Sequence, residues 1–182
     1  MNYVEPIRDK ETVEGIANYL KQGNDRDYVM FMTGLYTGLR ISDILLLKIS
    51  DVANKDSINL REKKTSKQRI IKLNPILKKL YKEYCFNKEY EEYLVSSQQN
   101  CFKAISRERA YMILRDVAKI FRIENIGTHT MRKTFGYHFY RDTKDIVTLQ
   151  KIFNHAAPSV TLRYIGIDQE NANKALENFK IF

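Results

Sequence analysis

Apolar residues recur every three or four positions along most of the chain, which is the spacing of amphipathic helices. The first such stretch lies between Asp9, whose carboxylate can cap a helix start, and Gly23, which can end a helix. Thr128 and Thr143 are the predicted caps of two later helices. The predicted helices cover about residues 9–23, 25–37, 42–47, 75–84, 106–121, 143–153, 158–164 and 169–179, and another begins at residue 129.

One segment leaves the helical spacing. Ser57–Lys63 and Gln68–Leu73 are β-prone, and the polar run Lys64-Thr65-Ser66-Lys67 between them predicts the turn of a hairpin. Helices around one hairpin predict an α+β, mainly helical fold with a small antiparallel β-sheet at about residues 57–73. Residues 86–100 are polar, partly acidic and give no clear prediction.

A chain of 182 residues suits one domain, and 43% apolar residues can build its core. We therefore expect a single domain over residues 1–182. The longest apolar stretch, Ile44 to Leu47, is far too short to cross a bilayer, and the N-terminus has no apolar run. These features predict a soluble, cytoplasmic protein with no membrane partner.

The charge balance favours a polyanionic partner. Lys and Arg number 31 against 22 Asp and Glu, which gives a formal net charge of +9. Each cation placed on a phosphate releases condensed counterions, although many basic domains bind no nucleic acid. The distribution is more informative, because residues 61–72 hold six basic side chains and one acidic one. Such a local excess is typical of a DNA-facing surface.

Two cysteines, Cys85 and Cys101, lie 16 residues apart, with no CxxC motif and no histidine nearby. A metal site needs more ligands at closer spacing. We therefore expect two thiols in a reducing compartment, neither of them a nucleophile, and no bound metal.

Several polar side chains stand at helix ends, where a helical core does not need them. Arg40 follows a helix break, and His129 and Arg132 share one face of a helix start. His155 comes directly after a helix stop, and Tyr164 lies in the short helix that follows. Arginine forks can hold the non-bridging oxygens of a phosphate and stabilise the charge of the transition state. Imidazoles can move protons, and a tyrosine can form a covalent intermediate.

Four motifs resemble those of the tyrosine recombinases, the phage integrase family. They are TGLRISDI (37–44), KTSKQR (64–69), THTMRKTF (128–135), and FNHA (153–156) followed by SVTLRYI (159–165). The resemblance runs from about residue 5 to 170. Any one motif alone is weak, but together and in this order they are specific. Residue 154 is Asn where glycine is more usual, and Asn tolerates the left-handed conformation that a helix C-terminus needs.

The resemblance implies a role for each matching residue. The catalytic set would be Arg40, Lys64, His129, Arg132, His155 and Tyr164, with Tyr164 as the nucleophile. Lys64 is preferred over Lys67 because it lies 24 residues after Arg40 and directly precedes the turn. Asp43 occupies the family's supporting acidic position. The expected DNA contacts are Lys63, Lys67, Arg69 and Lys133.

The resemblance also implies an activity and partners. The expected reaction is site-specific cleavage and rejoining of DNA strands through a 3′-phosphotyrosine intermediate, with no metal, ATP or other cofactor. The expected partners are double-stranded DNA and further copies of the chain in a dimer or tetramer on DNA, with no small-molecule substrate. A C-terminal helix at about residues 168–180 is expected to be exchanged with, or packed on, a neighbouring protomer. We expect the family's N-terminal DNA-clamping domain to be absent, because the matching motifs begin close to Met1.

Each residue taken singly has an ordinary alternative. Arg40 could pair with Asp43 at a helix end, Lys64 could be a solvated turn lysine, and Tyr164 could be one core aromatic among 12 tyrosines. His138, outside the set, is taken as structural. At the level of function, a non-catalytic DNA-binding relative and a type IB topoisomerase remain alternatives. The ordered set of six residues favours the recombinase.

Overall fold

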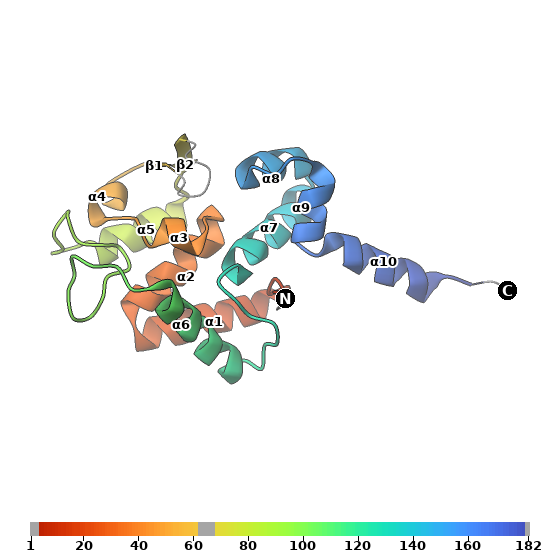
Figure 1. Cartoon of the computed structure of the whole chain (residues 1–182), viewed down its shortest axis with the longest axis horizontal. Helices are drawn as coiled ribbons and strands as arrows, with labels where there is room; N and C mark the ends of the chain where they lie inside the picture. Colours follow the sequence, from red (N-terminus) through yellow and green to blue (C-terminus); the bar gives the residue numbers. More distant parts are fainter. Residues whose placement is uncertain (1–3, 62–67, 181–182) are drawn as a thin grey trace.

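A computed structural model describes residues 4–61 and 68–180 of the chain (Figure 1). Most of the described chain is helical. The helices are α1 (Lys10–Gly23), α2 (Asp25–Thr37), α3 (Ile41–Ile44), α4 (Ile49–Val52), α5 (Pro75–Tyr84), α6 (Arg107–Ile120), α7 (Thr130–Thr143), α8 (Ile146–Phe153), α9 (Pro158–Tyr164) and α10 (Ile167–Asn178). Among the residues so described, no helix has the length and apolar character needed to cross a membrane.

The predicted hairpin is present. Strands β1 (Ser57–Arg61) and β2 (Gln68–Lys72) pair antiparallel, with Ser57 opposite Lys72 and Arg61 opposite Gln68. The predicted α+β, mainly helical fold with a small antiparallel sheet is therefore confirmed. Residues 62–67, which hold the predicted turn, lie outside the described residues.

Most of the helix ends follow the local end signals. Asp9 caps α1 through the backbone N–H of Thr12, and Asn74 caps α5, whose first residue is Pro75. Gly38 ends α2 in the left-handed conformation, with φ +61°. Ser106 caps α6. Side-chain acceptors satisfy the N–H groups that a helix start leaves without partners, so these ends are set by local chemistry.

Two predicted caps were wrong. α7 begins at Thr130 with His129 at the cap position, whereas Thr128 lies before the cap. Thr143 is the last residue of α7, where its hydroxyl donates to the carbonyl oxygen of Phe139 at 2.8 Å. Asp145 caps α8 instead and accepts from the Thr148 N–H. The Asp145 carboxylate therefore caps α8, because the Thr143 hydroxyl, two residues earlier, is already bonded inside α7.

The apolar residues form two cores. The larger packs α1, α2, α5 and α6 together and includes Ile16, Phe31 and Leu114. The smaller joins α7, α8 and α9 around Phe153 and Ile165. α7 packs against both α2 and α8 and so links the two parts of the fold. Arg40, His129, Arg132, His155 and Tyr164, the predicted catalytic residues that the structure describes, lie where these two parts meet.

α10 projects away from the rest of the chain (Figure 1). Its first turns are tied to α7, because Glu170 accepts from the Tyr137 hydroxyl at 3.0 Å and pairs with Arg141 at 3.3 Å. Farther along, Leu176 and Phe179 are 74% and 68% exposed. The helix is therefore anchored at its start and uncovered at its end.

Candidate active site

Arg132 is the most deeply buried charged residue among the candidates, with 2% of its surface exposed. It lies in the first turn of α7, and its guanidinium donates to the carbonyl oxygens of Gly38 and, at 3.0 Å, Phe153. The guanidinium also stacks over the Phe153 ring, 4.3 Å from the centroid. The end of α2 and the end of α8 thus fix its orientation together.

The Tyr164 side chain points into the same region. Its hydroxyl lies 3.2 Å from the Nδ1 atom of His129, and the two rings meet edge to face. The Arg132 side chain acts on the same phenol, because it opposes the rise of the Tyr164 pKa. Since Tyr164 is the last residue of α9 and His129 caps α7, the contact joins two helix ends.

His155 follows Asn154, whose left-handed conformation (φ +53°) ends α8 and turns the chain toward the cluster. Its Nδ1 atom lies 3.0 Å from the hydroxyl of Thr161, which is fully buried. Its ring contacts the Tyr164 ring at a centroid distance of 5.1 Å. A partner for one ring nitrogen fixes the orientation of the imidazole.

Arg40 precedes α3 at the sharp change of direction after Gly38. Its guanidinium lies 3.9 Å from the carboxylate of Asp43, which is buried. The two residues are three apart, as the predicted supporting role for Asp43 requires. The positive charge of Arg40 lowers the pKa values of His129, His155 and Tyr164, so it lies close to all three.

The surroundings shift the pKa of the Tyr164 phenol and the pKa values of the two imidazoles in opposite directions. Burial raises the pKa of Tyr164, and the charges of Arg132 and Arg40 oppose that rise. Burial lowers the pKa of His129 and of His155, and the charge of Arg132 adds to the effect. At neutral pH the phenol is therefore protonated and both imidazoles are neutral, so each imidazole has a nitrogen that can accept a proton.

Of the six predicted catalytic side chains, His129 thus contacts the Tyr164 hydroxyl, His155 contacts the Tyr164 ring, and the charges of Arg132 and Arg40 act on the phenol pKa. The sixth, Lys64, and the predicted DNA contacts Lys63 and Lys67 lie outside the described residues. The sequence pattern did not single out Thr161 or Phe153 as functional. For Thr161 the sequence does hold a signal, because this threonine lies between the histidine and the tyrosine of one motif. Nothing in the sequence marks Phe153 as the stacking partner of Arg132.

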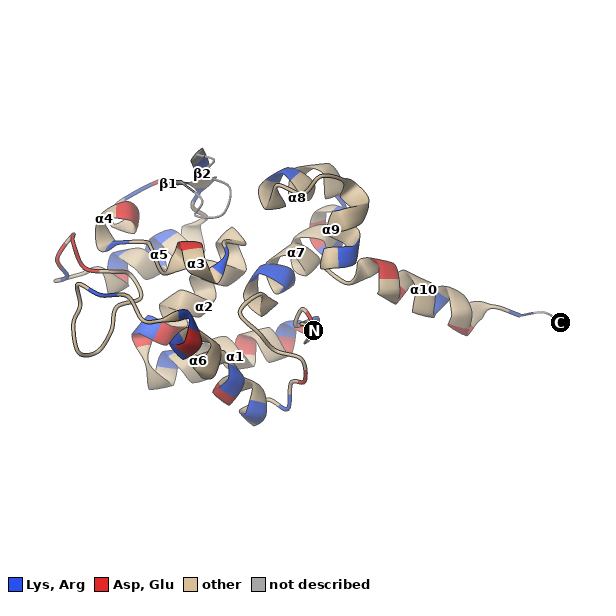
Figure 2. Ribbon diagram, viewed as in Figure 1, with Lys and Arg blue, Asp and Glu red and all other residues tan. Residues whose placement is uncertain are grey.

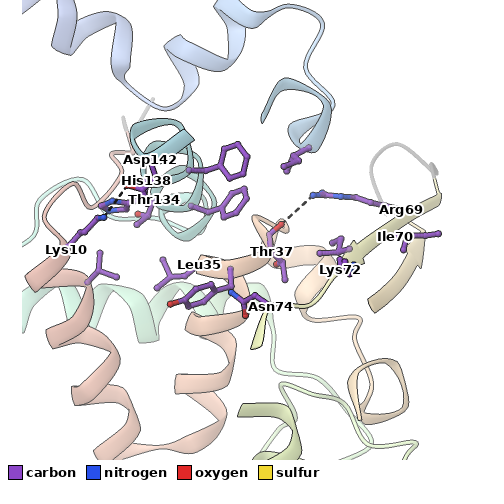
Figure 3. A pocket seen from close by; sticks show the side chains of 16 residues that line it. Lys10, Leu35, Thr37, Arg69, Ile70, Lys72, Asn74, Thr134, His138 and Asp142 are labelled. Carbon is purple, nitrogen blue, oxygen red and sulfur yellow. Dashed lines mark hydrogen bonds and ion pairs between the residues drawn. The ribbon is translucent and has the colours of Figure 1, made fainter. Parts of the chain in front are cut away.

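The two remaining predicted DNA contacts have different surroundings. Lys133 is half-buried, and its ammonium lies 5.1 Å from the centroid of the Tyr164 ring. Arg69 reaches from β2 to the carbonyl oxygen of Thr37 at 3.5 Å (Figure 3). It lines a groove of about 750 Å³ between α1, α2, β2 and α7, whose lining also includes Leu35 and His138. Of the predicted catalytic residues that the structure describes, none lines this groove.

The charge of the described chain is dispersed. Lysines and arginines lie on nearly every helix, with acidic residues between them (Figure 2). The excess of positive charge predicted for residues 61–72 is therefore accompanied by basic groups on α6, α7, α8 and α9.

The site can now be compared with known proteins. The family model described as Phage integrase family matches residues 8–171. The chain belongs to the phage integrase family. A relative, the probable integrase/recombinase YoeC of Bacillus subtilis, is 48% identical over 182 residues, which are 100% of this chain and 98% of YoeC. The probable integrase/recombinase of Acholeplasma phage L2 is 30% identical over 151 residues, 80% of this chain and 50% of the relative.

The fold agrees with this membership of the phage integrase family. The crystal structure of XerA recombinase superposes with a TM-score of 0.75 at 23% identity, over 98% of this chain and 67% of that one. Other relatives carry the name tyrosine recombinase, and this chain spans about half to three quarters of their length. The predicted family and enzyme class, the tyrosine-type site-specific recombinases, are confirmed.

Proposed function

We propose that this chain cleaves and rejoins DNA strands through a 3′-phosphotyrosine intermediate, with Tyr164 as the nucleophile. The observation that carries the proposal is the position of the Tyr164 hydroxyl. The hydroxyl lies 3.2 Å from a nitrogen of His129, the His155 ring contacts the Tyr164 ring, and the charges of Arg132 and Arg40 oppose the rise of the phenol pKa. A nucleophile, a proton acceptor and two cations meet at one point, as phosphoryl transfer requires.

In the proposed step the Tyr164 oxygen attacks the phosphorus of a phosphodiester. A bond forms between phosphorus and the phenol oxygen, and the bond between phosphorus and the 5′-oxygen breaks. The phenol proton passes to Nδ1 of His129, and the 5′-oxygen takes a proton from Lys64, which is assigned by the family resemblance. Rejoining is the reverse, with a 5′-hydroxyl attacking the phosphotyrosine. One ester replaces another, so the step needs no energy source.

The arginines supply the charge stabilisation in this proposal. The Arg132 guanidinium is held by two backbone carbonyl oxygens and cannot turn away, so little reorganisation is needed when a phosphate arrives. Arg40 enters from α3 with Asp43 beside it. Bidentate guanidinium contacts to the non-bridging oxygens would stabilise the additional negative charge of the transition state. His155, oriented by Thr161, would donate to the same oxygens from its other nitrogen.

The proposed partners are double-stranded DNA and further copies of the chain. Arg69 on β2, together with Lys63 and Lys67, would contact phosphates from the hairpin. The C-terminal helix would pack on a neighbouring protomer, because the uncovered side chains of Leu176 and Phe179 need an apolar surface. The catalytic domain would then span residues 1–182, with α10 reaching out of it.

A covalent adduct tests the proposal. The substrate is a set of duplexes covering the DNA that flanks the gene, each with a nick at a different position, so that a short cleaved fragment diffuses away and traps the intermediate. We expect an adduct that survives denaturation, and a Tyr164 peptide that carries a nucleotide 3′-phosphate by mass spectrometry. Tyr111→Phe, on the surface of α6, is the matched control and should form the adduct normally.

The possible results separate the alternatives. Equal adduct from the wild type and from Tyr164→Phe eliminates this nucleophile. Sequence-specific binding without any adduct from the wild type would indicate the non-catalytic DNA-binding relative.

A further inference from the structure

Lys133 is surrounded in a way that a simple DNA contact does not explain. It follows Arg132 on α7 and is half-buried. Its ammonium donates to the backbone carbonyl oxygen of Val4 at 2.6 Å. The same ammonium lies 5.1 Å from the centroid of the Tyr164 ring, within the range of a cation–π contact. Lys133 thus touches the N-terminal segment on one side and the proposed nucleophile on the other.

The N-terminal segment, residues 4–8, is itself fastened to α7. The Ile7 N–H donates to the Thr134 hydroxyl at 2.9 Å, and the Ile7 carbonyl oxygen lies 2.9 Å from Nε2 of His138. Both contacts are made by Ile7, three residues after Val4, to residues of α7 that follow Lys133. The carbonyl oxygen that receives Lys133 is therefore held in place by the segment around it.

The same segment also reaches the turn after Tyr164. Gly166 has φ +79° and separates α9 from α10. Nη2 of Arg8, paired with Glu5 at 2.6 Å, lies 2.8 Å from the point where a side chain on Gly166 would begin. The N-terminal segment is thus next to Tyr164 both through Lys133 and through this turn.

Tyr164 needs such support because its own helix is short. α9 has seven residues and Tyr164 is its last, so the backbone alone fixes the ring poorly. Phe153 and His155 contact the ring at centroid distances of 5.5 and 5.1 Å, both as edge contacts. Lys133 supplies the contact on the ring face.

We propose that Lys133 is a positioning residue that holds the Tyr164 ring in its attacking position, with the backbone of residues 4–8 as its anchor. This inference rests on the proposed function, which makes Tyr164 the nucleophile. It replaces the expectation that Lys133 contacts a DNA phosphate. Burial also lowers the pKa of Lys133, as expected for an ammonium partly withdrawn from water.

The contact can be tested without DNA. All tyrosines are replaced by 3-fluorotyrosine, and the ¹⁹F resonance of Tyr164 is assigned as the one missing in Tyr164→Phe. The other charged or titratable groups around this phenol are Arg40, Arg132, His129 and His155, and they stay in place. In Lys133→Met we expect the Tyr164 resonance to move and its titration midpoint to rise, since a nearby positive charge is lost.

Two further variants test the same contact between Lys133 and Tyr164. Lys133→Arg keeps a cation and should return the midpoint close to that of the wild type. Removing residues 2–5 deletes the Val4 carbonyl and should shift the Tyr164 resonance in the same direction as Lys133→Met. Combined with Lys133→Met, the truncation should add little, because both changes break one contact.

Lys144→Met is the matched control. Lys144 stands at the other end of α7, with its ammonium 5.4 Å from the centroid of the Tyr140 ring. This variant should move the Tyr140 resonance and leave that of Tyr164 unchanged. An unchanged resonance and midpoint for Tyr164 in folded Lys133→Met, or in the truncated chain, would overturn the proposal.

DNA binding separates positioning from a phosphate contact. On a labelled duplex of mixed sequence, loss of a phosphate contact lowers the slope of log affinity against log salt by about one. We expect Lys133→Met to leave that slope unchanged and to slow adduct formation several-fold. A reduced slope would overturn the positioning role. The ¹⁹F result does not depend on whether an adduct forms, so failure of the proposed function and failure of this inference are distinguishable.

Discussion

The hydroxyl of Tyr164 lies 3.2 Å from Nδ1 of His129, although 35 positions separate the two residues in the sequence. The contact exists because the end of α9 lies near the start of α7. Phe153 and Ile165 in the smaller core stabilise this arrangement by packing. The nucleophile and its proposed proton acceptor are therefore positioned by packing between helices and not by a local motif.

The first prediction concerns the nucleophile. Tyr164→Phe removes one oxygen and keeps the ring that packs against Phe153 and His155. We expect adduct formation to fall below detection, while the affinity for a duplex changes less than about twofold, since the hydroxyl contributes chemistry rather than binding. Adduct on nicked duplexes and fluorescence anisotropy measure the two effects. A variant that binds DNA tenfold more weakly would mean that the hydroxyl has a binding role.

The second prediction concerns Arg132. Arg132→Ala leaves the carbonyl oxygens of Gly38 and Phe153 without their donor in a buried place, so the free energy of unfolding should fall by about 2 kcal/mol. Adduct formation should be lost and DNA affinity reduced, because a phosphate contact goes as well. Urea unfolding and anisotropy measure the two losses.

Arg132→Lys is the informative companion. It retains the charge, but one ammonium cannot bridge two carbonyl oxygens as a planar fork does. We expect DNA affinity to recover partly and adduct formation to remain low. Full activity in Arg132→Lys would show that the charge alone suffices.

The third prediction tests the bend that presents Arg40 and the carbonyl for Arg132. Gly38 has φ +61°, and a methyl group there would clash with a ring carbon of Phe135. Gly38→Ala should therefore lower the free energy of unfolding by roughly 2–3 kcal/mol, from backbone strain and the clash together. Gly23→Ala is the control, because nothing lies within 4 Å of the added methyl group. Similar losses from both variants would contradict this account of the bend.

The fourth prediction is a pH dependence of stability. The folded state lowers the pKa of His129 and of His155 below their usual value near 6.5. Below that value the unfolded chain binds protons that the folded chain does not bind. The free energy of unfolding therefore falls as the pH falls. The contribution of the two neutral histidines to the free energy of unfolding is complete above pH about 6.5. It declines as the pH falls toward their lower pKa values in the folded state. Buried-carboxylate effects belong to a lower window, because Asp and Glu titrate near pH 4.

Urea midpoints between pH 5 and 8 measure this dependence. The double variant His129→Asn, His155→Asn should show a flatter profile over the same range. An identical slope in the wild type and the double variant would place the proton linkage elsewhere.

Much of the fold could be predicted because its signals are local. Asp9, Asn74 and Ser106 cap helices with their own side chains, and Gly38 ends one by its left-handed backbone. Where two side chains could cap the same helix, the prediction was wrong: Asp145, and not Thr143, caps α8. Short α4 was not predicted, since four residues carry no helical periodicity.

The site itself was predictable only in part. The residues followed from motifs, but their contacts depend on which helix ends meet in space. That Arg132 is held by the carbonyl oxygens of Gly38 and Phe153 depends on backbone atoms that every residue has. Lys133 was predicted to contact DNA from the family resemblance. Its contacts with Val4 and Tyr164 join segments that are far apart in sequence.

The fifth prediction concerns the exposed end of α10. Glu170 ties the start of this helix to Tyr137 and Arg141, whereas Leu176 and Phe179 are exposed. Deleting Asn178–Phe182 removes Phe179 and none of the Glu170 contacts, so the melting temperature should change by less than about 2 °C. If the end of the helix packs on a neighbouring protomer, the deletion should weaken cooperative assembly on a DNA with two sites.

A matched variant separates a local effect from an assembly effect in this fifth prediction. Glu170→Gln keeps the exposed end but weakens its anchor on α7, and should lower the melting temperature more than the deletion does. Electrophoretic mobility on one-site and two-site duplexes measures assembly. A deletion that unfolds the chain, or that assembles on two sites like the wild type, would mean that α10 serves its own domain only.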